Sequence, residues 1–189
     1  MGTDPKARLH PWCFEWDERK QCGAVYDGPP EQRYLAKVGG FLVQNTVLAA
    51  TRDFEALSLL AASKNERIRS GVPKRIAQLG IVDGGSGEDI IGLLADDEST
   101  VVRSAVAGFT SDPELKRYMA SDPEHEVRRS VLTGTEDQDL ISSLAGDAHP
   151  YVRATVAHVS NDRVLLASLL TDQDDWVRSR ATDRLRALR

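Results

Sequence analysis

Residues 143–159 read SLAGDAHPYVRATVAHV, and close copies of this stretch recur along the chain. The copies at 93–109, 118–134 and 168–184 read LLADDESTVVRSAVAGF, YMASDPEHEVRRSVLTG and SLLTDQDDWVRSRATDR. Each copy contains a valine followed by arginine, and from Val102 onward these pairs recur every 25 residues. A fixed period of this length is typical of a solenoid, in which stacked repeats each pack only against their neighbours.

Two earlier copies extend the pattern, with the pairs Val43-Gln44 and Ile68-Arg69, and the step from Ile68 to Val102 is 34 residues. Two polar columns accompany the aliphatic one. The Asp column, five residues before the aliphatic position, consists of Asp97, Asp122, Asp147 and Asp172. The Arg column, directly after that position, consists of Arg69, Arg103, Arg128, Arg153 and Arg178. Ser63 and Gln44 replace Asp and Arg in the early copies, so the pattern is expected to fray toward the N-terminus.

The columns predict two short helices in each repeat and therefore an all-α fold. Polar starts such as Ser111-Asp112-Pro113 supply an N-cap and a first-turn proline for the first helix. The Asp column is expected to cap the second helix, as in Asp122-Pro123-Glu124. The second helix then carries apolar residues at i, i+3, i+4 and i+7, the spacing of one buried face.

The four quoted copies resemble leucine-rich-repeat variant and HEAT-like repeats, and the short period favours the former type because HEAT units are longer. The resemblance covers roughly residues 34–189. It implies a right-handed α-solenoid of about six 25-residue two-helix repeats, with residues 1–33 as an N-terminal cap segment. It also implies that the Asp and Arg columns form a structural ladder. Some leucine-rich-repeat variant proteins carry an iron–sulfur cluster, which normally takes four thiolates; this chain has two cysteines, so no cofactor is expected.

The expected cap contains the chain's two cysteines and an alternation of aromatic residues, Trp12, Phe14 and Trp16, that suits an extended segment covering the first repeat. His10, Cys13 and Cys22 could bind zinc with a fourth ligand such as Asp17. A disulfide is a second reading. Reduced thiols are favoured over both, since the spacing lacks a tight C-x2-C knuckle and so few cysteines indicate a reducing cytoplasm.

The long step of 34 residues indicates an insertion near residues 80–89, which read GIVDGGSGED. Glycine at this density predicts a loop. The loop is either a surface insertion, the favoured reading, or a mobile element that closes on a ligand; a phosphate loop would need a preceding strand and a following Lys-Ser/Thr. Pro73 falls inside the second helix of its copy and is expected to interrupt it.

The surface residues point to binding of a protein or peptide. Tyr151 and Trp176 stand just before the aliphatic position, in a column that changes chemistry between repeats, and with Arg129 they are the predicted partner-contact patch. Local packing of the two aromatic residues is the alternative. The arginines could instead track a phosphate backbone, but the net charge of −5 and the neighbouring carboxylates disfavour nucleic acid. No apolar run is long enough to predict a membrane span.

No catalytic motif stands out in the sequence. His125, His149 and His158 occupy different columns and are not expected to meet, and neither G-x-S-x-G nor H-E-x-x-H occurs. The sequence therefore favours a non-catalytic scaffold in the cytoplasm, without a metal. The alternatives are a nucleic-acid or anion binder that uses the Arg column, and a small enzyme with a site in a concave groove.

Overall fold

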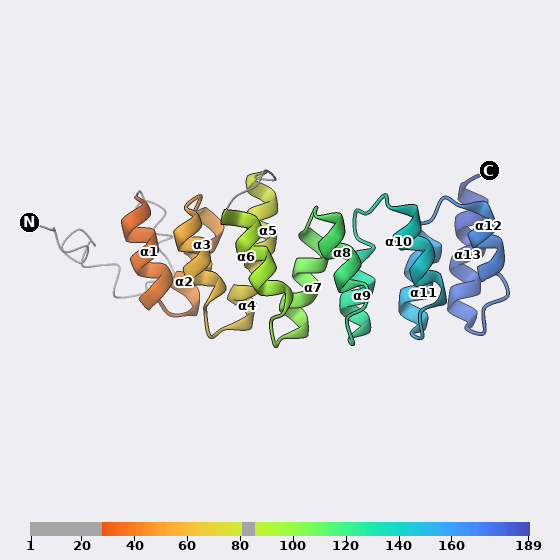
Figure 1. Ribbon diagram of the computed structural model, residues 1–189, viewed down its shortest axis with the longest axis horizontal. Coiled ribbons are helices and arrows are strands. Elements are labelled where there is room, and N and C mark those ends of the chain that lie inside the picture. The colour runs from red at the N-terminus through yellow and green to blue at the C-terminus, as the bar shows by residue number, and fades with distance from the viewer. Residues whose placement is uncertain (1–27, 81–85) are drawn as a thin grey trace, which may run out of the picture. The chain divides into compact units, whose positions relative to one another are not determined.

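The computed structural model describes residues 28–80 and 86–189, and over these residues the fold is all-α, with no β-strand. His10, Cys13, Cys22 and the aromatic residues of the expected cap lie outside the described residues, as do residues 81–85 of the glycine-rich segment. The chain divides into two compact units, residues 1–90 and 91–189, and each unit is described by itself (Figure 1).

The first unit consists of short helices, and helices that are close in sequence pack on one another. They are α1 (Pro29–Val38), α2 (Phe41–Ala50), α3 (Phe54–Ala61), α4 (Glu66–Arg69) and α5 (Gly71–Leu79), and α6 (Ser86–Ala95) begins here and ends in the second unit. Helix α1 packs on both α2 and α3, and α2 contacts α4 and α5. The loop expected at 80–89 ends earlier than the sequence indicated, because residues 86–89 form the first turn of α6.

The interruption expected at Pro73 is present. The second helix of this copy is split into α4 and α5, which meet at Ser70, and Pro73 lies in the first turn of α5. Proline has no N–H to donate to the carbonyl of residue 69, so the helical hydrogen-bond ladder cannot continue through it, whereas the first turn tolerates it. Gly80 then ends α5 in the left-handed conformation, with φ of 66°.

The second unit alternates short first helices with second helices. They are α7 (Thr100–Phe109), α8 (Pro113–Met119), α9 (His125–Val131), α10 (Gln138–Ser143), the 3-10 turn η3 (Leu144–Gly146), α11 (Pro150–Val159), α12 (Arg163–Leu169) and α13 (Asp175–Ala187). The second helices contact one another in the order α7, α9, α11 and α13. Each also packs on the first helix before it: α8 on α9, η3 on α11 and α12 on α13.

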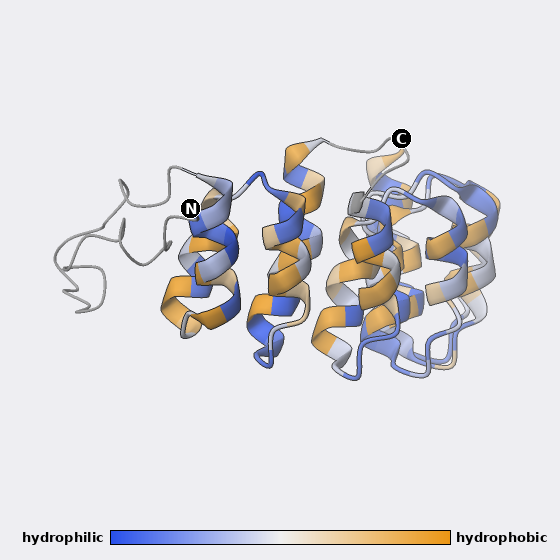
Figure 2. Ribbon diagram, turned by 60° about the vertical axis from the view of Figure 1, so that its left-hand side comes forward, coloured by the Kyte–Doolittle hydropathy of each residue, from blue (hydrophilic) through white to orange (hydrophobic). Residues whose placement is uncertain are grey.

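The aliphatic columns form the core of the second unit. Val102, Val127, Val152 and Val177 are fully buried, as are the residues four positions later, Val106, Val131, Val156 and Ala181. Polar residues gather in the connecting loops, which are largely blue in Figure 2. Burying a valine side chain stabilises the fold by about 1.5–2 kcal/mol. Because helices of 6–13 residues are marginal alone, this shared core holds them.

The caps of the first helices are those expected from the sequence. Asp53, Asp112, Asp137 and Asp162 are the N-cap residues of α3, α8, α10 and α12, and each accepts a backbone N–H with its side chain. The expectation that the Asp column caps the second helices is wrong. The N-caps of α7, α9, α11 and α13 lie two residues later, at Ser99, Glu124, His149 and Asp174.

Candidate functional site

The Arg and Asp columns meet between successive copies of the repeat. In each of three cases an arginine donates from Nε and Nη2 to both carboxylate oxygens of the aspartate 19 residues later. The Nε distances are 2.7 Å for Arg103–Asp122, Arg128–Asp147 and Arg153–Asp172, and the Nη2 distances are 3.2, 2.8 and 2.8 Å. Two parallel charged hydrogen bonds of this kind fix both the distance and the orientation of the partners.

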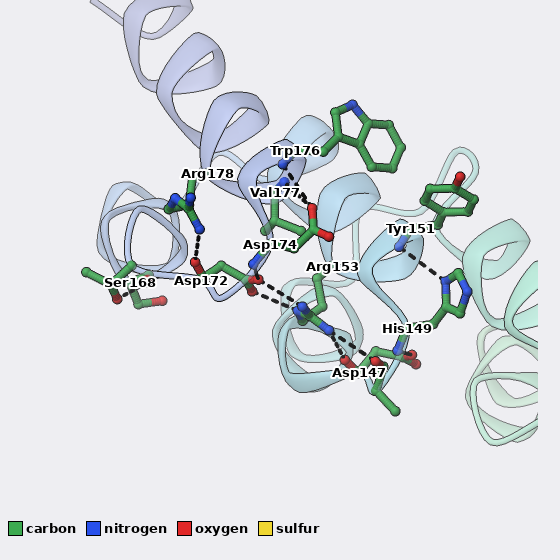
Figure 3. Close-up of polar contacts among 12 residues, drawn as sticks. Asp147, His149, Tyr151, Arg153, Ser168, Asp172, Asp174, Trp176, Val177 and Arg178 are labelled. Carbon is green, nitrogen blue, oxygen red and sulfur yellow. Dashed lines mark hydrogen bonds and ion pairs between the residues drawn. The ribbon is translucent and has the colours of Figure 1, made fainter.

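The same groups also tie the loop before each second helix. Nη1 of Arg153 donates to the carbonyl oxygens of Asp147 and Ala148 at 2.8 and 3.2 Å, while a carboxylate oxygen of Asp147 accepts the backbone N–H of His149 at 2.8 Å (Figure 3). Arg103 and Arg128 bond the carbonyls of Asp97 and Asp122 in the same way. Each aspartate is thus placed before the helix, where it serves its own loop and the preceding arginine at once, and this explains why it is not the N-cap.

Arg69 and Arg178, at the two ends of the Arg column, also bond backbone carbonyls. Arg69 is buried and donates to the carbonyl of Ser63 at 2.9 Å, and the carboxylate of Asp97 accepts the N–H of Ser99 at 2.8 Å. Arg178 donates to the carbonyl of Asp172 at 2.6 Å and forms an ion pair with Asp175. The last repeat thus pairs its arginine within its own helix, three residues away.

A neutral pair stands in the position where the sequence indicated a frayed ladder. Ser63 Oγ donates to Gln44 Oε1 at 2.9 Å, again across a separation of 19 residues. Gln44 Nε2 donates to the carbonyl of Ala36 at 2.8 Å, and Ser63 Oγ accepts the N–H of Asn65 at 3.2 Å. Both partners differ from the other copies, yet they join the same two columns across the same separation without charge.

Pairing shifts the carboxylates toward their ionised form. The hydrogen bond from Arg153 holds the pKa of Asp172 below its usual range, and burial only partly opposes this. Burial alone would raise the pKa of Asp147, but the hydrogen bonds from Arg128 and from the N–H of His149 outweigh it and lower the pKa. Carboxylates held ionised beside permanently charged arginines have no proton to transfer near neutral pH.

A second group of side chains lies on the N-terminal turns of α9, α11 and α13. We call it the aromatic strip, and it consists of His125, His149, Tyr151 and Trp176. The rings of His125 and His149 stack with centroids 3.5 Å apart, and Tyr151 meets Trp176 edge to face at 5.0 Å and 85°. His149 contacts Tyr151 at 5.1 Å. Four rings from three helices therefore form one continuous surface.

Two of the four residues of the strip, Tyr151 and Trp176, are exposed although their rings touch, and the two histidines are half-buried. The exposed fractions of Tyr151 and Trp176 are 53% and 41%. His149 is fixed by its place as N-cap, since its Nδ1 accepts the backbone N–H of Tyr151 at 3.3 Å (Figure 3). The expectation that the histidines do not meet is wrong for His125 and His149: they occupy adjacent columns of adjacent copies, and the contact between α9 and α11 brings the rings together.

Two arginines are relevant to this surface: Arg129, which the sequence predicted to belong to it, and Arg180, which the sequence did not indicate. The guanidinium carbon of Arg180 lies 5.5 Å from the centroid of the Trp176 ring, within the range of a cation–π contact. Arg129 is exposed on α9, and none of the ring or cation contacts in residues 86–189 includes it. Sequence reasoning missed Arg180, although its spacing of four from Trp176 places it on the same helix face.

Polar groups also line two shallow grooves in the second unit. One, of about 500 Å³, is lined by Phe109, Lys116 and Asp137 among others. Lys116 occupies a column that holds Leu57, Ile91, Ile141 and Leu166 in four other copies and Gln32 in the first, and its Nζ donates to the carbonyl of Thr133 at 2.8 Å. That carbonyl is exposed because α9 ends at Val131 and Gly134 turns away with φ of 64°. Burial lowers the pKa of Lys116. The other groove is lined by Arg103 and Asp122, which already bond each other.

Metal donors cluster at one end of the strip. Glu124, His125 and Glu126 each offer a ligand atom within 4.8 Å of the others, and His125 Nδ1 lies 3.1 Å from a carboxylate oxygen of Glu126. These residues are consecutive and lie at the surface, and an imidazole–carboxylate hydrogen bond has the same spacing. The geometry therefore does not require a metal.

Comparison with models of known protein families finds no match, and a search of curated proteins finds none either. Within residues 28–80 and 86–189, no helix combines the length and the apolar character that a membrane crossing requires.

Proposed function

We propose that this chain is a non-catalytic scaffold that binds a protein or peptide partner through the aromatic strip. The observation that carries the proposal is the continuity of ring contacts across α9, α11 and α13, in which Tyr151 and Trp176 are exposed. Large, rigid aromatic side chains supply much contact area at low entropic cost, and they are enriched among the residues that dominate binding energies.

The pairing of the Arg column favours this reading over the binding of nucleic acid. A phosphate backbone is held by arginine and lysine side chains that reach the solvent. Here the guanidinium groups of Arg103, Arg128 and Arg153 are directed into carboxylates of the protein itself. An anion would have to displace a bidentate partner that is already in place.

We further propose that the six sequence copies form one right-handed α-solenoid of two-helix repeats. The proposal is supported by the order of the helices, which follows the sequence period, and by the arginine–aspartate bonds between successive copies in residues 91–189. Small-angle scattering tests it: a compact chain of this length would have a radius of gyration of roughly 16 Å. A solenoid is expected to exceed that value clearly, and a measured value of 16 Å would contradict it.

The partner-binding proposal is tested with matched variants of the full chain. Partners are captured from the native extract, identified, purified, and titrated against the wild type and against Tyr151→Ala and Trp176→Ala. We expect each variant to weaken binding by about 30-fold, the effect of losing a residue worth 2 kcal/mol. Tyr118→Ala, which removes an exposed tyrosine from α8, is the control and should bind normally.

Circular dichroism establishes that each variant is folded. If Tyr151→Ala and Trp176→Ala bind the purified partner as tightly as Tyr118→Ala does, the strip is not the binding surface. An oligonucleotide that binds with an affinity falling steeply with salt would favour the nucleic-acid alternative instead.

A further inference from the structure

Charge is unevenly distributed along the chain. Residues 91–189 carry 17 acidic and 12 basic side chains, whereas residues 1–90 carry 12 of each, so the whole net charge of −5 belongs to the second unit. This unit also carries the aromatic strip. A surface in a field of this sign attracts cations and repels anions.

Carboxylates that take no part in the arginine–aspartate pairs of the ladder lie beside the strip. The turns that carry the rings begin with further carboxylates: Glu124 and Glu126 at the start of α9, and Asp174 and Asp175 at the start of α13. Asp174 accepts the N–H of Trp176 itself at 2.9 Å (Figure 3). Carboxylates thus flank the rings at both ends of the strip.

The rings themselves suit a cation. The face of an aromatic ring carries a negative electrostatic potential, and a guanidinium or ammonium group placed over it is attracted. Trp176 already holds such a group, since the Arg180 guanidinium carbon lies 5.5 Å from its centroid. Tyr151 stands at 85° to Trp176 and presents a second exposed ring next to it.

We propose that the aromatic strip binds a cationic segment of its partner, with Lys or Arg side chains placed against Tyr151 and Trp176 and neutralised by the flanking carboxylates. This inference rests on the proposed function and adds the chemistry of the ligand. In this arrangement Arg180 competes with the ligand: it occupies a ring and repels an incoming cation.

The probe is a fluorescein-labelled nonapeptide with arginine at every second position, separated by glycine and serine. A matched peptide carries citrulline in place of arginine, which keeps the shape of the side chain and removes its charge. Fluorescence polarisation with the full-length protein measures both affinities at low and moderate salt. We expect binding of the arginine peptide to be at least tenfold tighter than that of the citrulline peptide, and to weaken by about tenfold in Trp176→Ala.

Two paired variants separate the local surface from general charge. Glu124→Gln/Glu126→Gln removes two carboxylates beside the strip, and Glu136→Gln/Asp139→Asn removes two exposed carboxylates elsewhere in the same unit. We expect the first pair to weaken binding and the second to leave it nearly unchanged. Equal effects of the two pairs would show only a general attraction to an acidic protein and would overturn the inference.

Arg180→Gln gives the most discriminating result. If the strip accepts cations, removing this resident guanidinium should strengthen binding of the arginine peptide by about two- to threefold. A loss of arginine-peptide binding equal to that of Trp176→Ala would contradict this competition and count against the inference. Failure of the arginine peptide to bind at low salt, or equal binding of the citrulline peptide, overturns the cationic inference. The proposed function fails separately, if Tyr151→Ala and Trp176→Ala leave binding of the native partner intact.

Discussion

Removing one partner of the pair between Arg153 and Asp172 should destabilise the fold severely, whereas replacing both residues with a neutral pair should not. The two side chains are only 6% and 8% exposed. The change to test is Arg153→Gln, alone and together with Asp172→Ser. The double variant reproduces the pair that the chain already uses at Gln44 and Ser63.

The magnitude follows from what each variant leaves unpaired. Arg153→Gln removes two charged hydrogen bonds from the Asp172 carboxylate and two from backbone carbonyls. Leaving a buried carboxylate without its partner costs 3–5 kcal/mol, and because Asp172 still accepts the backbone N–H of Asp174 we expect about 3 kcal/mol. In the double variant the hydroxyl can accept the N–H of Asp174, as Ser63 accepts that of Asn65. We therefore expect a coupling energy of about 2 kcal/mol in favour of the double variant.

Urea denaturation followed by far-UV circular dichroism measures both values, provided that the dependence of the unfolding free energy on urea keeps the same slope. For a chain of this size the loss in Arg153→Gln corresponds to about 6–12 °C in the melting temperature. A single variant within 1 kcal/mol of the wild type would refute the reasoning, and so would a double variant whose loss equals the sum of the two single losses.

Three further outcomes follow from the structure. The hydrogen bond from Arg153 lowers the pKa of Asp172 in the folded state. The contribution of this carboxylate to stability is therefore complete above about pH 4 and is lost as the pH falls below the pKa of about 3.9 that an aspartate has in the unfolded chain. Asp172→Asn should flatten an acid denaturation curve in that range. Lys116→Leu should raise the unfolding free energy by about 1 kcal/mol in thermal melts, since the apolar surface that leucine buries outweighs the one lost hydrogen bond to Thr133. Because burial lowers the pKa of Lys116, the wild type should also gain stability as the pH approaches 10, and the variant should not. Gly134→Ala should cost about 1 kcal/mol through the left-handed backbone alone, because an added methyl group meets no atom within 4 Å; a chemical melt with no change would contradict it.

The all-helical fold could be predicted because one period controls both sequence and packing. A valine that recurs every 25 residues must face the same neighbour in each copy, and Val102, Val127, Val152 and Val177 are all fully buried. Pro73 was equally readable, since a missing N–H has the same effect in any helix. The N-caps of the second helices could not be predicted. In the sequence, Asp122 and its equivalents are equally suited to cap a helix and to pair with an arginine, and only the position of the preceding arginine in the structure decides between the two roles.

The candidate site was harder to predict for the same reason. A column places side chains relative to its own helix, but contact between copies depends on how far adjacent helices are shifted along each other. His125 and His149 differ by one column and still stack at 3.5 Å. Arg129 and Arg180 are both exposed arginines four residues after a ring of the strip, His125 and Trp176, yet within residues 86–189 the cation–π contact is that of Arg180 with Trp176. Helical spacing alone therefore does not decide the contact.

The Gln44–Ser63 pair indicates that the ladder has a structural role, and in this respect the ladder differs from the strip. A feature that served a ligand through its charge could not be replaced by an amide and a hydroxyl in one copy of the same chain, whereas a feature that holds adjacent loops together can, as long as the bonds are kept. The strip shows the opposite behaviour. Its rings are confined to α9, α11 and α13 and correspond to unrelated residues in the other copies, such as Leu42 and Arg67 at the position of Tyr151. Such residues are dispensable for a repeated architecture, and this supports the proposal that the strip binds a partner.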